Sequence, residues 1–153
     1  MTVAARPLSA AEARLWELEA GGDASGVHRF ALAYRLTGPL DVERLVAALR
    51  AVVARHVGLR VRVVTRDGTA ALEDQPDLEV RLERRPETGE AVDAALLELA
   101  RAPFDLAEGP AWRGALFTQA ADDHTLLLRF HHIAADRWSV AVLMGDLGRA
   151  YTA

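Results

Sequence analysis

The chain has 153 residues, of which 51% are hydrophobic and 26% are charged, a balance typical of one globular domain. Its formal net charge of −4 argues against the clustered basic surface of a nucleic-acid-binding protein. All 18 of its basic residues are arginine. The absence of cysteine excludes disulfides, thiolate catalysis and zinc–sulfur sites. No run approaches the roughly 20 apolar residues of a membrane helix, and no secretory signal is visible. We therefore expect a cytoplasmic protein that does not contact a membrane.

The first quarter of the chain predicts a helix, a strand and the start of a second helix. Ser9 and Glu12 have the spacing of a capping box, which predicts a helix over 9–20. Residues 27–37 alternate between apolar and other residues, as a strand does. Asp41 then has the position of a helix N-cap before a run of apolar residues at helical spacing. The apolar residues that share one face of the strand are Phe30, Leu32, Tyr34 and Leu36.

The middle of the chain predicts a hairpin and a further strand. Residues 59–65 form the first arm, and Asp67 and Gly68 are a strong signal for a tight turn back to a partner at 70–74. Apolar and charged residues then alternate over 78–83, which predicts a half-buried strand.

The last third of the chain predicts a helix over 88–102 and strands over 112–119 and 124–131. A final helix is expected to begin with Ser139 as its N-cap. Together these elements predict an α/β fold of the α+β two-layer type, in which helices pack on a mixed sheet within one domain.

Two adjacent histidines end the last predicted strand. Because strand side chains alternate, His131 and His132 must point to opposite faces, and only one of them can face a given cleft. A histidine there could act as a general base or as an orienting acceptor, and it could equally be structural. Asp136 follows closely enough to pair with an arginine or to hold the turn. We expect no metal site, because opposed side chains cannot chelate one ion and no third ligand is evident nearby.

The segment that contains both histidines resembles the His-His-x-x-x-Asp core of condensation domains from non-ribosomal peptide synthetases and of related carrier-dependent acyltransferases. Trp138 and Ser139 continue the motif as those proteins do. Three other segments resemble further motifs of the family in the same order and at similar spacing: Leu8 to Trp16, Arg55 to Arg60, and Pro103 to Arg113.

This resemblance implies a fold like that of chloramphenicol acetyltransferase. Complete domains of the family have two such lobes with a tunnel between them, and peptidyl or acyl carrier proteins deliver a donor thioester and an acceptor amine on phosphopantetheine. Residues 1–153 resemble the N-terminal lobe only. We therefore expect the isolated chain to be inactive, to lack a cofactor of its own and to self-associate through an exposed lobe interface.

The resemblance also implies a role for each motif residue. His132 would be the catalytic histidine, which takes a proton from the attacking amine or holds that amine against the thioester carbonyl. His131 would be structural. Asp136 would also be structural, in an ion pair with Arg60 or, failing that, with Arg55.

The chain departs from the family pattern at Arg137, where the family usually has glycine. An arginine there could narrow the tunnel, contact a substrate or simply point into solvent. Trp138 and Ser139 are further candidates for contact with the tunnel or the substrate, although Ser139 suits a helix cap better than a nucleophile. An epimerization domain, another carrier-dependent acyltransferase and a non-catalytic carrier-recruiting scaffold remain as alternatives.

Overall fold

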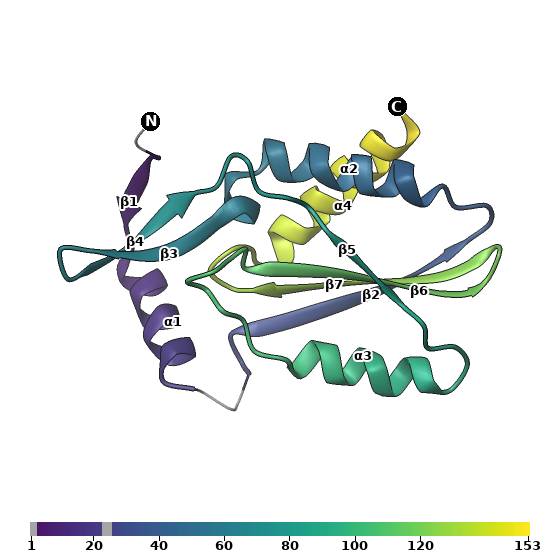
Figure 1. The fold of residues 1–153 in the computed structure, drawn as a ribbon, viewed down its shortest axis with the longest axis horizontal. Coiled ribbons are helices and arrows are strands. Elements are labelled where there is room, and N and C mark those ends of the chain that lie inside the picture. The colour runs from purple at the N-terminus through teal and green to yellow at the C-terminus, as the bar shows by residue number, and fades with distance from the viewer. Residues whose placement is uncertain (1–2, 23–25) are drawn as a thin grey trace.

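The computed structural model describes residues 3–22 and 26–153, and its centre is a four-stranded mixed sheet with the order β2-β7-β6-β5 (Figure 1). The central strand β7 is antiparallel to its neighbours β2 and β6, and β5 is parallel to β6. This arrangement confirms the predicted mixed sheet. The strands are β2 (Arg29–Thr37), β5 (Leu82–Arg85), β6 (Trp112–Ala120) and β7 (Asp123–His131).

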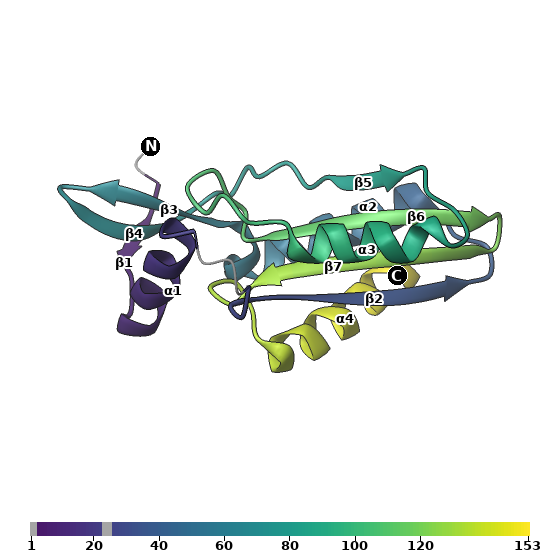
Figure 2. The same ribbon diagram turned by 90° about the horizontal axis from the view of Figure 1, so that it is seen from below.

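Helices cover both faces of this sheet. Helices α2 (Val42–Arg55) and α4 (Arg137–Thr152) lie on one face, and α3 (Ala91–Arg101) lies on the other (Figures 1 and 2). Because strand side chains alternate, Leu126 of β7 packs beneath α2 and α4, whereas Leu127 packs against α3. The predicted α/β fold, with helices packed on a mixed sheet, is confirmed, and the helices on both faces give the central sheet three layers where two were predicted. Within residues 3–22 and 26–153, no helix has the length and apolar character needed to cross a membrane.

A second, three-stranded antiparallel sheet has the order β1-β4-β3 and lies at one end of the molecule. The predicted turn at Asp67 and Gly68 is confirmed, with positive φ angles of 51° and 77° that suit a tight hairpin. Helix α1 (Ala10–Ala20) packs on this sheet through Leu15 and Trp16. The strands are β1 (Ala5–Pro7), β3 (Val61–Arg66) and β4 (Thr69–Asp74), and a short 3-10 helix, η1 (Val57–Arg60), precedes β3.

The local signals of the sequence hold for most elements. The capping box of α1 is present, with the Glu12 amide donating to Ser9 Oγ at 3.1 Å and the Ser9 amide donating to Glu12 Oε2 at 2.8 Å. Asp41 caps α2 as predicted. The strand predicted over 78–83 is wrong in its bounds, since β5 begins only at Leu82. Before Leu82, apolar and charged residues alternate because the apolar side chains are turned inward, and an irregular segment can bury alternate residues as a strand does.

Candidate active site at the histidine turn

Residues 131–136, which we call the histidine turn, connect the end of β7 to the start of α4. The His131 amide donates to the Ala111 carbonyl at 2.9 Å, and the His132 amide donates to the His28 carbonyl at 2.8 Å. The Ala134 amide then closes the turn by donating to the His131 carbonyl at 2.9 Å. Both histidines are therefore held through their backbones by neighbouring segments.

The two histidine side chains have opposite environments, as the strand alternation predicts. His131 is completely buried, with 0% of its surface exposed, whereas His132 is exposed. The ring of His132 lies 4.8 Å from the ring of Phe30, measured between centroids. Of the two rings, only that of His132 is open to an approaching substrate.

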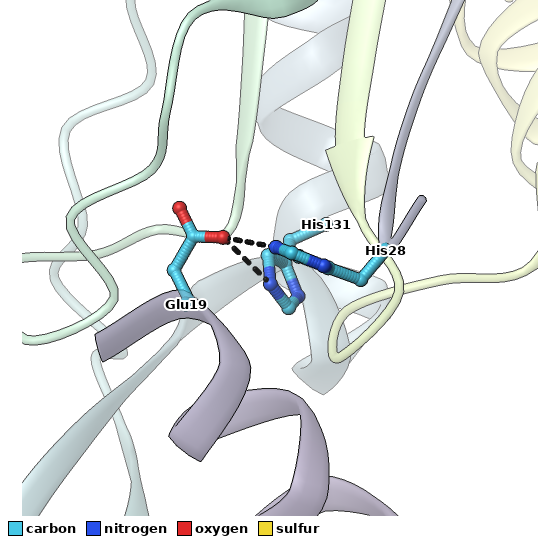
Figure 3. A group of neighbouring side chains, drawn as sticks. All are labelled: Glu19, His28 and His131. Atoms are coloured by element: carbon cyan, nitrogen blue, oxygen red, sulfur yellow. Dashed lines mark hydrogen bonds and ion pairs between the residues drawn. The ribbon is translucent and has the colours of Figure 1, made fainter. Parts of the chain in front are cut away.

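The buried ring belongs to a cluster of three residues, Glu19, His28 and His131, which we call the anchor cluster (Figure 3). His28 Nε2 lies 2.5 Å from Glu19 Oε2, and His131 Nε2 lies 3.5 Å from the same oxygen. The other carboxylate oxygen, Oε1, accepts from the Phe104 amide at 2.9 Å. Neither Glu19 nor His28 lies in the four segments that resemble the family motifs.

The protonation of His131 is set by its hydrogen bonds. The Ile133 amide donates to His131 Nδ1 at 3.0 Å, so Nδ1 carries no proton and the neutral ring carries its proton on Nε2, facing Glu19. Burial lowers the pKa of His131 to about 4, although the Glu19 charge opposes this shift. Burial alone would raise the pKa of Glu19, but the Phe104 amide and His28 hold it below its usual value.

The anchor cluster also has the composition of a possible metal site, since its three potential ligand atoms lie within 4.8 Å of one another. The hydrogen bond from Ile133 argues against this use. A His131 ring that accepts at Nδ1 bears its proton at Nε2, and that nitrogen then has no lone pair to offer an ion. The geometry fits a hydrogen-bonding network.

Asp136 is the N-cap of α4, which corrects two predictions. Its Oδ1 accepts from both the amide and the hydroxyl of Ser139, each at 2.7 Å, so Asp136 and not Ser139 is the cap. These two hydrogen bonds lower the pKa of the Asp136 carboxyl. The predicted ion pair with Arg60 is wrong, because Arg60 Nε binds Asp74 Oδ1 at 2.7 Å. Arg55, the alternative partner, is paired with Asp146 instead, and its Nε lies 3.4 Å from Asp146 Oδ2.

Arg137 is exposed and is the first residue of α4. Among the described residues, Asp67 alone has a positive φ without being glycine, so Arg137 does not strain the backbone where the family usually has glycine. Trp138 is 82% exposed and, with Val57 and Val142, lines part of a cavity of about 370 Å³ beside the turn.

Gly58 brings a second sequence motif against the histidine turn. A Cβ atom at this position would lie 2.8 Å from the carbonyl oxygen of Ala134, which is closer than real contacts allow. Only glycine permits η1 to pack this closely against the turn. The motif segment Arg55 to Arg60 therefore supports the histidine turn through its backbone at Gly58 and not through an arginine.

Comparison with known proteins places the chain in a family. The model of the condensation domain matches residues 4–153. The isonitrile lipopeptide synthase of Mycobacterium tuberculosis is 43% identical over 159 residues, which is 97% of this chain and 6% of that protein. In the complex of the X-domain and OxyB from teicoplanin biosynthesis, the matching structure has a TM-score of 0.88 and 37% identity, covering 95% of this chain and 32% of that one.

A third comparison bears on the fold alone. The starter condensation domain of rhizomide synthetase has a TM-score of 0.86 at 22% identity, which supports the predicted resemblance to the chloramphenicol acetyltransferase fold. The chain spans about a third of these matched structures and a small fraction of the curated synthetase. Because the family model matches residues 4–153, this chain belongs to the condensation-domain family.

Proposed function

We propose that this chain is the N-terminal lobe of a condensation domain that joins a carrier-bound acyl thioester to a carrier-bound amine. The observation that carries the proposal is the exposure of His132 at the end of β7, directly beside the fully buried His131. The family match over residues 4–153 supports the reaction class.

In the proposed reaction, the amine nitrogen attacks the thioester carbonyl, a carbon–nitrogen bond forms and the carbon–sulfur bond breaks. The leaving thiol remains on the phosphopantetheine arm of the donor carrier. His132 takes the proton of the amine or holds the amine in line with the carbonyl, and both actions lower the barrier. Its ring is oriented by Phe30, and its backbone is held by His28.

The partners that this proposal implies are the donor and acceptor carrier proteins and a C-terminal lobe. Trp138, Val57 and Val142 are 82%, 49% and 47% exposed beside the histidine turn, an apolar surface that a second lobe would cover. Arg137 and Trp138 are exposed and free to face a tunnel there, whereas the hydroxyl of Ser139 is engaged by Asp136. Without a second lobe, we expect the chain to be inactive and prone to self-association.

A second candidate function is a module that recruits a partner without catalysing condensation. Two observations favour it: the matched X-domain structure is a complex with OxyB, and Arg137 replaces the usual glycine. The exposed His132 favours the catalytic proposal over this one.

The test is amide formation by a complete condensation domain that contains this lobe, supplied with a loaded donor carrier and a loaded acceptor carrier. We expect His132→Ala to lower the rate by about 10²- to 10⁴-fold, the usual contribution of a positioned acid–base group. Arg84→Ala, which changes an exposed residue on β5, is the control and should leave the rate unchanged. Unchanged product in the folded His132→Ala variant, or no product from the unaltered domain, would favour the recruiting module.

A further inference from the structure

We propose that Glu19 is a positioning residue for His132, which it holds in place through His28 on one side and through His131 on the other. The catalytic consequence of this proposal rests on the function proposed for His132, but the positioning itself does not. Glu19 lies on α1, far from the histidine turn in sequence, and no side-chain contact between Glu19 and His132 is required.

The first route runs through His131. Oε2 of Glu19 lies 3.5 Å from Nε2 of His131, too far for a hydrogen bond here, but its negative charge favours a proton on Nε2 and so leaves Nδ1 free to accept. Nδ1 then receives the Ile133 amide at 3.0 Å. This bond fixes the backbone on the far side of His132.

The second route runs through His28. Glu19 Oε2 binds the His28 ring at 2.5 Å, and the carbonyl of His28 accepts from the His132 amide at 2.8 Å. Phe30, which lies on β2 two residues after His28, has its ring 4.8 Å from the His132 ring. His132 is thus held between two residues whose rings both point at one carboxylate oxygen.

The position of Glu19 on its helix supports a role beyond the stability of α1. It lies in the last turn of the helix, where the helix dipole disfavours a negative charge. Its side chain is only 7% exposed, so its charge is also taken out of water. The charge is compensated by the Phe104 amide, by the two histidines and by Arg29, whose Nε lies 4.0 Å from Oε2.

The hydrogen-bond directions explain why the residue must be a carboxylate. Oε1 accepts from the Phe104 amide while Oε2 faces two ring nitrogens, so every neighbour of the group requires an acceptor. Glutamine has nearly the same shape but offers one oxygen and one donating NH2 group. In either orientation, Glu19→Gln would place a donor against a donor and release one of the routes to His132.

The positioning can be tested on this chain by NMR, using labelled histidine and amide hydrogen exchange. The chain has five histidines, which single replacements would assign. We expect His131 to show the Nε2–H tautomer and the Ile133 amide to be protected from exchange. In Glu19→Gln, the protection of Ile133 should fall by about tenfold, the equivalent of one hydrogen bond, and the His132 resonances should shift.

The matched control is Glu17→Gln, which makes the same change at an exposed position on the same helix and should leave both readouts unchanged. Amides in the centre of β7 should keep their protection in both variants, which separates a local effect from unfolding. If Glu19→Gln fails to fold, Glu19→Asp provides the same readouts with the charge retained on a shorter side chain. Unchanged Ile133 protection and unchanged His132 resonances in a folded variant would overturn the proposal.

The catalytic consequence is tested in a complete condensation domain that contains this lobe. We expect Glu19→Gln to lower kcat by about tenfold or more with little change in KM, because a misplaced base impairs the chemical step. In a His132→Ala background, the same change should cause no further loss. If His132→Ala proves fully active, the proposed function fails, whereas the NMR result still decides whether Glu19 positions His132. An equal loss from Glu19→Gln in both backgrounds would show that it does not act through His132.

Discussion

The two sides of the histidine turn differ in almost every physical property, although they are built from adjacent residues. On the buried side, His131 is fully enclosed, and its ring accepts a hydrogen bond from the Ile133 amide and lies beside the Glu19 carboxylate. On the exposed side, the ring of His132 has one aromatic neighbour, Phe30, and remains open to solvent. The difference indicates that the buried side supplies rigidity and leaves the exposed side free to bind.

This contrast between the buried and the exposed side predicts that replacing His131 lowers the stability of the fold much more than replacing His132. His131→Ala would leave a cavity and an unpaired Ile133 amide in the core, so we expect it to lower the free energy of unfolding by about 3 kcal/mol or more. His132→Ala changes an exposed residue and should cost less than about 0.5 kcal/mol. Urea denaturation of both variants at neutral pH measures the difference.

Equal destabilisation by the two replacements would break the comparison, because it would mean that His132 also carries structure. A His131→Asn variant is a useful intermediate, since its side-chain oxygen can still accept from Ile133. It should retain part of the stability that His131→Ala loses.

The buried side should also make stability depend on pH. The pKa of His131 is about 4 in the folded chain, against about 6.5 for an unperturbed histidine. Between these values the unfolded chain binds more protons than the folded one, so stability is full above about pH 6.5 and falls as the pH is lowered towards 4. The lowered pKa of Glu19 acts in the same direction at the acid end of this range. Linkage sets the expected loss from His131 at about 3 kcal/mol.

The measurement is the free energy of unfolding at a series of pH values from neutral to acid, for the unaltered chain and for His131→Asn. The variant lacks the titrating ring, so its stability should decline less steeply with falling pH. If the two curves were parallel, the pH dependence would have another source.

The features of the site that the sequence predicted depend on neighbours in the chain. Strand alternation separates His131 from His132, and the capping-box spacing locates the start of α1. The Asp67–Gly68 turn fixes the register of the β3–β4 hairpin, with Val61 opposite Asp74. That register also predicts the ion pair of Arg62 with Glu73, which lie opposite each other and are 2.7 Å apart. It does not predict the pair of Arg60 with Asp74, because Arg60 precedes β3 and lies opposite Gln75.

The anchor cluster could not be found in this way, because its members come together through tertiary contacts. The antiparallel register of β2 and β7, in which Arg29 faces His131, brings His28 beside the histidine turn. Nothing local in the sequence specifies that β2 pairs with β7 rather than with another strand. Glu19 joins the cluster through the packing of α1, and its own helix has the same carboxylate at the exposed Glu17.

The smallest predicted effect concerns the residue at which the turn ends. If Asp136 were in a buried ion pair, its removal would cost about 3–5 kcal/mol, but as a helix cap it should contribute only about 1 kcal/mol. We therefore expect Asp136→Ala to lower the free energy of unfolding by about 1 kcal/mol and Asp136→Asn to have little effect, since asparagine also caps helices well. A loss above about 3 kcal/mol in Asp136→Ala would contradict the capping role. A small loss accompanied by a shift of the His132 resonances would show that the start of α4 helps to aim the exposed ring.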